Sequence, residues 1–421
     1  MSENLKYDTF FTKYPKLLLT FLILVFVFIF YRPILLHPNE FIFSDKGDAI
    51  KNYYCYDWHI KNDNSFVDYT GTNYPFGELH AYTDGNPLLG NFIKIFSFLK
   101  PYSIAIYNLS LLLSFIFCSL LLFKIFEEFK LPKINSITAS LGITILCPQA
   151  FRLAGHFALS YSFAIPLTIL LIILFENRNK HSYYSFLILG FLLCLFFIHQ
   201  YLGMICASTV FLFWLFNFIF FPVKIKTRLK YFLVQFVLPV VAYLSFLKLF
   251  DHHVDRPTDT YGFLYFTSNI ETVFISTLPP FRHFLSLIYK IEIQNWEGIA
   301  YVGILTTILS AFIIILLLLK RNQLRSYFKE NIEERTLLFL GLGSCLLLLF
   351  SMGYPFKWGM ENLLDSIPLF KQFRAPGRFA WSFYFLSTIA STIVLSRYFL
   401  KKQKYILKVG LGSILLCLYI I

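Results

Sequence analysis

The sequence predicts an all-α integral membrane protein with about eleven transmembrane helices and a long first external loop. Hydrophobic residues make up 57% of the 421 residues and charged residues only 14%, whereas a soluble domain carries about 25% charged residues. The mean hydropathy is +0.63. Many of the apolar residues lie in runs that approach the length of a membrane-spanning helix, which is about 20 residues.

The first apolar run, residues 17–36, is too long for a signal-peptide core and lacks a small-residue cleavage site, so we expect a retained helix. Further runs follow at about residues 102–123, 134–150, 157–175, 183–199, 203–221, 231–250, 299–319, 336–352, 379–396 and 406–421. No polar residues follow the last run, although interfacial anchors normally flank natural spans, which predicts a missing C-terminal part. Residues 1–421 are interpreted as a single polytopic membrane domain.

Lys and Arg predict the orientation, because loops on the cytoplasmic side are enriched in both. With the N-terminus in the cytoplasm, the inside segments hold 21 basic and 8 acidic residues, a net charge of +13. The outside segments hold 15 basic and 16 acidic residues, a net charge of −1. The pattern predicts a multi-pass protein of the cytoplasmic (inner) membrane with external loops 37–100, 251–298 and 353–378. The excess positive charge is therefore a topology signal, and no nucleic-acid partner is expected.

The first external loop is the main candidate for a functional site. It holds eight of the 24 acidic residues: Glu40, Asp45, Asp48, Asp57, Asp63, Asp68, Glu78 and Asp84. Linkers between spans are usually short, so a long acidic loop indicates a function. Its apolar run 88–99 is too short for a span and predicts a short interfacial or re-entrant helix.

Asp45 and Asp48 are the predicted catalytic residues. A spacing of three residues places both carboxylates on one helical face, although Gly47 between them makes a turn equally compatible. Such a pair can deprotonate an acceptor hydroxyl or hold a divalent cation, the only cofactor considered. The alternative role for Asp48 is to cap a helix that begins at Ala49.

Four further residues of the external segments are predicted to contact substrate. Glu78 and Asp84 lie in turn-rich sequence, and the alternative for Asp84 is a local turn that its own side chain stabilises. Arg152 and His156 lie in the outer turn 150–156 and suit contact with a phosphate or an acceptor. The alternative for Arg152 is snorkelling at the membrane interface. His199, in the next outer turn, is interpreted as structural.

Three cations precede the tenth predicted span: Lys371, Arg374 and Arg378. Positive charge at the N-terminus of a helix opposes the helix dipole, which indicates an anionic partner such as a lipid phosphate or diphosphate. The planar fork of Arg binds phosphate oxygens in pairs. The alternative is contact with anionic membrane lipids in general.

Together these features resemble the GT-C superfamily of membrane glycosyltransferases. The resemblance is architectural and covers the whole chain: a cytoplasmic N-terminus, an acidic motif after the first span, and a late basic outer loop. It implies that an Asp of the first external loop acts at the catalytic centre, and Asp45 and Asp48 stand in that position. The segment 373–379, with Arg374 and Arg378, looks like the Arg-containing late loop of several bacterial members.

The resemblance also implies a polyprenyl-phosphate sugar as donor, inversion at the sugar, and a lipid, glycan or protein as acceptor. The chain departs from many members because it lacks their soluble C-terminal domain. A lipid-linked sugar transporter or flippase is the second hypothesis, although transporters place ionisable residues near the bilayer midplane and this chain concentrates them outside. A non-enzymatic polytopic membrane protein is the third, and it gives no reason for a long acidic loop.

Overall fold

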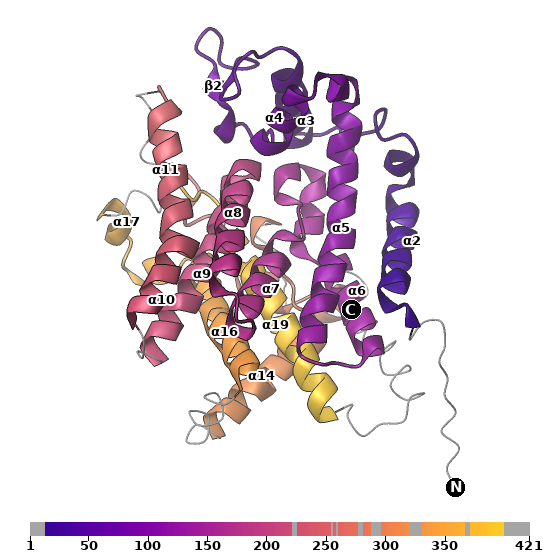
Figure 1. Ribbon diagram of the computed structural model, residues 1–421, viewed down its shortest axis with the longest axis vertical. Helices are drawn as coiled ribbons and strands as arrows, with labels where there is room; N and C mark the ends of the chain where they lie inside the picture. The colour runs from indigo at the N-terminus through magenta and orange to yellow at the C-terminus, as the bar shows by residue number, and fades with distance from the viewer. Residues whose placement is uncertain are drawn as a thin grey trace.

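The computed structural model describes residues 13–220, 225–253, 256–257, 260–276, 281–287, 296–319, 331–366 and 371–399. This part of the chain is an all-α bundle, as the sequence predicts, and its only sheet has two short strands (Figure 1). Nine helices among the described residues are long and apolar enough to cross a membrane. The protein is therefore embedded in a membrane.

Nine of the predicted runs coincide with these helices, which are Pro15–Leu36, Ser97–Glu128, Lys133–Ala154, Phe157–Asn177, His181–Ile198, Gln200–Phe220, Ile225–Phe250, Ile332–Ser351 and Pro376–Phe399. The predicted run 299–319 forms α14 (Ile304–Leu319), which has 16 residues and is shorter than these nine helices. The run 406–421 lies outside the described residues. The count of eleven therefore stays a prediction.

The body of the bundle is built from ten helical segments. They are α2 (Pro15–Leu36), α5 (Ser103–Glu128), α6 (Lys133–Ile145), α7 (Ala164–Asn177), α8 (His181–Ile198), α9 (Gln200–Phe220), α10 (Ile225–Phe232) joined through a π-helical turn to α11 (Leu238–Phe250), α14, α16 (Ile332–Ser351) and α19 (Ala380–Val394). The spans that contain α7 and α19 are the most enclosed, with 83% of their apolar windows buried, against 22% for α2. The core of the bundle therefore lies around α7 and α19, and α2 packs at its edge.

Helix α2 shows how the sequence sets an element. Pro15 sits in its first turn, where a missing amide hydrogen costs nothing. Pro33 lies inside the helix and cannot donate to the carbonyl one turn back, so the backbone leaves helical geometry at Tyr31 (φ −126°, ψ 25°). The helix then ends at Leu36, before the long loop.

The first long loop covers one end of the bundle, which we call the capped end (Figure 1). It contains α3 (Asp48–Lys61), the antiparallel strands β1 (Asp68–Tyr69) and β2 (Glu78–Leu79), and α4 (Pro87–Ile95). The side-chain oxygen of Asn86 accepts from the Leu89 amide and Pro87 fixes the first turn, which starts α4. The short helices predicted for this loop are thus present.

Ion pairs between basic and acidic side chains hold the opposite end of the bundle together. Four of them join neighbouring helix ends: Lys16 to Glu127 (3.3 Å), Arg178 to Glu128 (2.9 Å), Arg335 to Glu176 (3.0 Å) and Arg397 to Glu334. All eight residues belong to segments predicted to face the cytoplasm. The structure therefore brings together the charges that the sequence assigns to one side.

The first long loop forms the cap over the capped end of the bundle (Figure 1). A buried polar network around Asp63 holds this cap together. Its carboxylate accepts hydrogen bonds from His59 Nδ1 (3.0 Å), the Thr70 amide (3.1 Å) and the Thr70 hydroxyl. The other His59 nitrogen meets Asn91 Oδ1 at 2.9 Å, and the ring centroids of His59 and His80 lie 3.7 Å apart. One carboxylate thus ties α3 to the strands, and His59 continues the network to α4.

Asp63→Ala is expected to loosen the cap without unfolding the bundle. The change leaves buried donors of His59 and Thr70 unpaired, at a cost of about 1–3 kcal/mol. Hydrogen exchange of amides in residues 59–91 should then speed up by about tenfold or more. Asp68→Ala, at an exposed position of the same loop, is the matched control. Unchanged protection in Asp63→Ala would show that the network does not hold the cap.

Candidate functional site

Charged and imidazole side chains from five separate segments converge at the capped end. We call them the loop cluster: Asp48 and Lys51 of α3, Asp84, Arg152 of η3 (Pro148–Ala154), His156, His199, Glu297 of η6 (Trp296–Gly298) and Arg378 of η8 (Pro376–Phe379). The arginines and Glu297 are almost fully buried. The side chains of Asp84 and Asp48 are 25% and 55% exposed. The loop cluster therefore has a buried floor and a solvent-exposed edge, which we call the open edge.

The floor of the loop cluster is one carboxylate, that of Glu297, held between two guanidinium groups. Arg378 grips Glu297 through Nε to Oε2 (2.8 Å) and Nη2 to Oε1 (3.0 Å). Arg152 donates from Nη1 to Glu297 Oε2 (2.9 Å) and from Nη2 to the carbonyls of Trp296 and Glu297. Two cations against one anion leave this floor with a formal charge of +1.

Aromatic rings enclose both guanidinium groups. Arg152 lies 4.4 Å from the centroid of the Trp296 ring and 5.5 Å from that of Trp381, and Arg378 lies 4.5 Å from the Tyr201 ring. Such contacts are worth about 2 kcal/mol where they are desolvated. Burial tends to raise the pKa of the Glu297 carboxyl, but the positive charge of Arg378 and the hydrogen bonds hold it below its usual range. Glu297 is therefore ionised.

Asp84 is oriented by His199. The Tyr201 amide donates to His199 Nδ1 (3.1 Å), so the ring proton sits on Nε2, which donates to Asp84 Oδ1 at 3.0 Å. Burial tends to raise the pKa of Asp84, but the His199 hydrogen bond and the nearby positive charge of Lys51 lower it below its ordinary value. Burial also lowers the pKa of His199, which keeps it neutral. Asp84 is thus a fixed carboxylate.

The second oxygen of Asp84 faces the open edge. Lys51 Nζ lies 3.6 Å and His156 Nδ1 3.9 Å from Asp84 Oδ2, both beyond hydrogen-bond length. Asp84 itself has a left-handed backbone (φ 60°). The turn predicted there exists, but the Asp84 side chain bonds to His199, and it is Asn86 that caps the next helix. Asp84 Oδ2 therefore has capacity for one further donor.

His156 lies between three carboxylates. Its Nε2 is 3.5 Å from Glu297 Oε1 and 3.7 Å from Asp48 Oδ2, and its ring stacks on Trp296 with an interplanar angle of 11°. Its Nδ1 is buried and has no hydrogen-bond partner among the described residues. The imidazole is thus placed between the buried floor and the open edge, where it can donate or accept a proton.

The structure brings Asp48, Asp84, Arg152, His156 and Arg378 of the predicted site together. Arg152 is fully buried, so it does not snorkel. Asp48 is the first residue of α3 and makes no side-chain cap: Gly47, with φ 52°, occupies the capping position. The capping role considered for Asp48 is therefore wrong.

Four predicted site residues lie outside the loop cluster. Asp45 is exposed and makes no ion pair within the described residues. Glu78 binds Arg256, Lys371 pairs with Asp365 (2.6 Å), and Arg374 is exposed, with Nε on the Tyr261 carbonyl (3.2 Å). A substrate contact by any of these remains a prediction.

Sequence reasoning missed Lys51, His199 and Glu297. His199 stands in a tight turn between two helices, where a polar residue is expected for structural reasons alone. Glu297 lies in a long loop with no recognisable motif. Only the pairing of buried charges in space identifies either residue, and no local pattern carries that information.

A divalent cation remains a prediction. Among the described residues, the one group of three whose ligand atoms lie close together is Glu78, Asp251 and His253, within 4.8 Å of one another. Arg256 already binds both of its carboxylates, which disfavours a second cation there. Neither Asp45 nor Asp48, the predicted ligands, belongs to this group.

Comparison with known proteins gives one match, a domain of unknown function, DUF6311, which covers residues 20–419. The chain belongs to the DUF6311 family. No curated protein and no solved structure matches the chain. The family thus spans the whole bundle together with its cap, and the loop cluster lies within it.

Proposed function

We propose that the protein is a membrane glycosyltransferase that moves a sugar from a polyprenyl-phosphate donor to an acceptor at the outer face of the cytoplasmic membrane. The observation that carries the proposal is the presence of the Asp84 carboxylate and two buried arginines in one cluster. A carboxylate with one free oxygen faces the open edge, and two guanidinium groups lie in the buried floor. This combination provides a base and an anion-stabilising site within one cluster.

In the proposed reaction, Asp84 Oδ2 takes the proton of an acceptor hydroxyl as its oxygen attacks the anomeric carbon of the sugar. The bond between that carbon and the phosphate oxygen breaks, and the electron pair leaves with the lipid phosphate. A single displacement inverts the anomeric carbon. The phosphate is a good leaving group, so the main electrostatic task is to stabilise its charge.

Arg378 is the proposed stabiliser of that charge. Its guanidinium is prepositioned on Glu297 and on the Tyr201 ring, so it needs no reorganisation during the reaction. The floor of the loop cluster has a formal charge of +1, which matches the single negative charge of a phosphodiester. Asp48 and Lys51, at the open edge, are the proposed acceptor contacts.

The decisive experiment is transfer in vitro. Purified protein in detergent or liposomes is incubated with synthetic polyprenyl-phosphate glucose, mannose or galactose carrying a labelled sugar, together with a membrane extract as acceptor. Labelled glycan that appears only with active protein supports the enzyme. Labelled donor that only changes leaflet in liposomes, without loss of its sugar, would support a flippase instead. Addition of a chelator tests for a divalent cation.

The proposal requires the capped end to face outward. Single cysteines at Asn62, at the end of α3, and at Lys226, in α10, are therefore expected to differ in whole cells. The cysteine at position 62 should react with an impermeant maleimide, and that at position 226 only after the membrane is opened. The reverse result would place the loop cluster in the cytoplasm and exclude a donor in the outer leaflet.

A further inference from the structure

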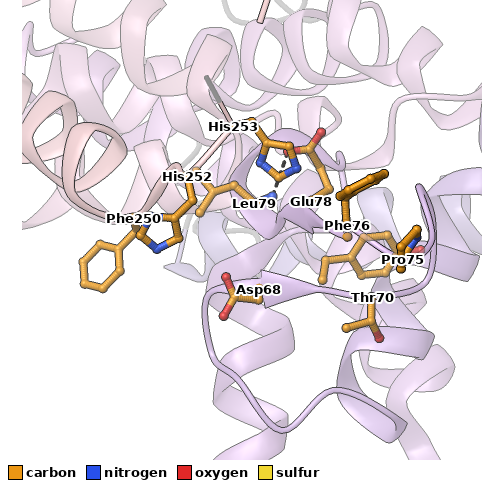
Figure 2. A pocket seen from close by; sticks show the side chains of 11 residues that line it. Asp68, Thr70, Pro75, Phe76, Glu78, Leu79, Phe250, His252 and His253 are labelled. Atoms are coloured by element: carbon orange, nitrogen blue, oxygen red, sulfur yellow. Dashed lines mark hydrogen bonds between the residues drawn. The ribbon is translucent and has the colours of Figure 1, made fainter. Parts of the chain in front are cut away.

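A cavity lies in the cap, and none of its lining residues belongs to the loop cluster. It has a volume of about 130 Å³ and is formed between the two strands, the turn that joins them, and the chain that follows α11. Figure 2 shows Phe76 and Pro75 on one side, Phe250 and His252 on the opposite side, and Asp68 below them. The lining combines aromatic faces with hydrogen-bonding groups.

The walls of this cavity are fixed before any ligand arrives. Arg256 bridges Glu78 of β2 and Asp251, which follows α11, so it ties the two walls together. The turn is closed by hydrogen bonds from the Phe76 and Gly77 amides to the Asn73 carbonyl (2.9 and 3.1 Å). Gly77 has φ +70°, and a side chain there would meet the Tyr69 carbonyl. A rigid site loses little entropy on binding.

Two features of the lining are exposed to solvent without a structural reason. The Phe76 side chain is 79% exposed, and the Asp68 carboxylate is exposed and makes no ion pair among the described residues. The strands belong to the loop that covers one end of the bundle (Figure 1). An exposed aromatic face beside a free carboxylate indicates a ligand with both apolar and hydroxyl surfaces.

The charge of the cavity selects the class of ligand. Two carboxylates, Asp68 and Glu78, line the cavity, and the one guanidinium bound to Glu78, that of Arg256, is shared with a third carboxylate, Asp251. This excess of negative charge repels phosphates and uronic acids. It suits neutral hydroxyl groups, because a carboxylate accepts strong hydrogen bonds from them.

We propose that this cavity binds a neutral carbohydrate, as an acceptor-side contact of the enzyme. The choice of a carbohydrate acceptor rests on the function proposed above. Phe76 packs on the C–H face of a sugar ring, and Asp68 accepts from its hydroxyls. Glu78 and Asp84 are six residues apart in the chain, so their Cα atoms lie at most about 22 Å apart. A short oligosaccharide spans that distance from the cavity to the loop cluster.

The test measures binding alone, so it does not depend on transfer. Maltotetraose, mannotetraose and cellotetraose are added to the purified full-length protein without donor, and association is followed by saturation-transfer NMR, with tetragalacturonate as the anionic comparison. At least one neutral sugar should bind and the uronate should not. Phe76→Ala and Asp68→Asn should each weaken binding about tenfold, the effect of losing one charge-assisted hydrogen bond or an equivalent contact.

Tyr74→Ala is the matched control, because Tyr74 is 92% exposed on the same turn but does not line the cavity. It should bind like the unchanged protein. Absence of binding by all three neutral sugars, or equal weakening by all three substitutions, overturns the assignment. Binding without transfer would instead remove the proposed enzyme and keep the carbohydrate site.

Discussion

Asp84→Asn is expected to lower the rate of sugar transfer by about 10² to 10⁴, the usual effect of removing a general base. The amide keeps the size of the side chain, and its oxygen still accepts the hydrogen bond from His199 Nε2. It cannot take a proton from an acceptor hydroxyl. The measurement is the initial rate of transfer at saturating donor, with folding followed by the amount of monodisperse protein.

The matched control is Glu40→Gln, since Glu40 belongs to the same loop but its side chain is 73% exposed, and its one ion pair within the described part of the chain is with His37. Its transfer rate should not change. Asp45→Asn and Asp48→Asn are compared alongside, because both positions are predicted for catalysis from the sequence. If Asp48→Asn abolishes transfer while Asp84→Asn retains it, the base lies at the start of α3.

The acid side of the pH profile gives an independent check. Because the pKa of Asp84 lies below its ordinary value, the carboxylate stays ionised when the pH falls through the range where a free Asp becomes protonated. Transfer should therefore persist through the range in which a free Asp takes up its proton, and a loss of activity near neutral pH would show that it depends on a group other than Asp84.

The sequence predicts the bundle well because transmembrane helices depend on one property, the length of an apolar run. Nine runs were placed correctly for that reason. Helix α14, which lies within the predicted run 299–319, has 16 residues and is shorter than these nine helices. The four ion pairs at the end opposite the cap join residues that the sequence assigns to one side, whereas the side of the membrane on which that end lies stays a prediction.

The loop cluster was only partly predictable, because its geometry depends on contacts between distant segments. Arg378 and Glu297 are 81 positions apart, and Asp84 and His199 are 115 positions apart. The sequence separates Arg374 from Arg378 by only four positions, yet Arg374 is exposed and Arg378 is buried in the cluster. Spacing along the chain could not distinguish these two arginines, whereas packing against α9 and η6 does.

Arg378→Lys is expected to lower kcat/KM for the donor by about 10² to 10³, the effect of removing one preorganised donor to a developing anion. The charge is kept, but an ammonium cannot hold Glu297 through two parallel hydrogen bonds and present a further donor to the phosphate. The measurement is transfer as a function of donor concentration, with the acceptor concentration fixed. Arg378→Ala should be worse and should also unfold at a lower temperature, since breaking a buried ion pair costs about 3–5 kcal/mol.

The Lys variant is needed because Arg378→Ala also loses stability. A second substitution separates the loss of stability from the loss of transfer. Arg378→Met removes the charge but keeps most of the side-chain volume, and the Glu297 carboxylate keeps Arg152 as a partner, so stability should recover relative to Arg378→Ala. Transfer should not recover with it. Arg282→Lys, at an exposed position in the short helix α13 (Phe281–Ser286), is the matched control and should leave donor kinetics unchanged. If Arg378→Lys transfers sugar at the normal rate and with normal donor dependence, Arg378 is only a structural partner of Glu297, and the lipid phosphate binds elsewhere.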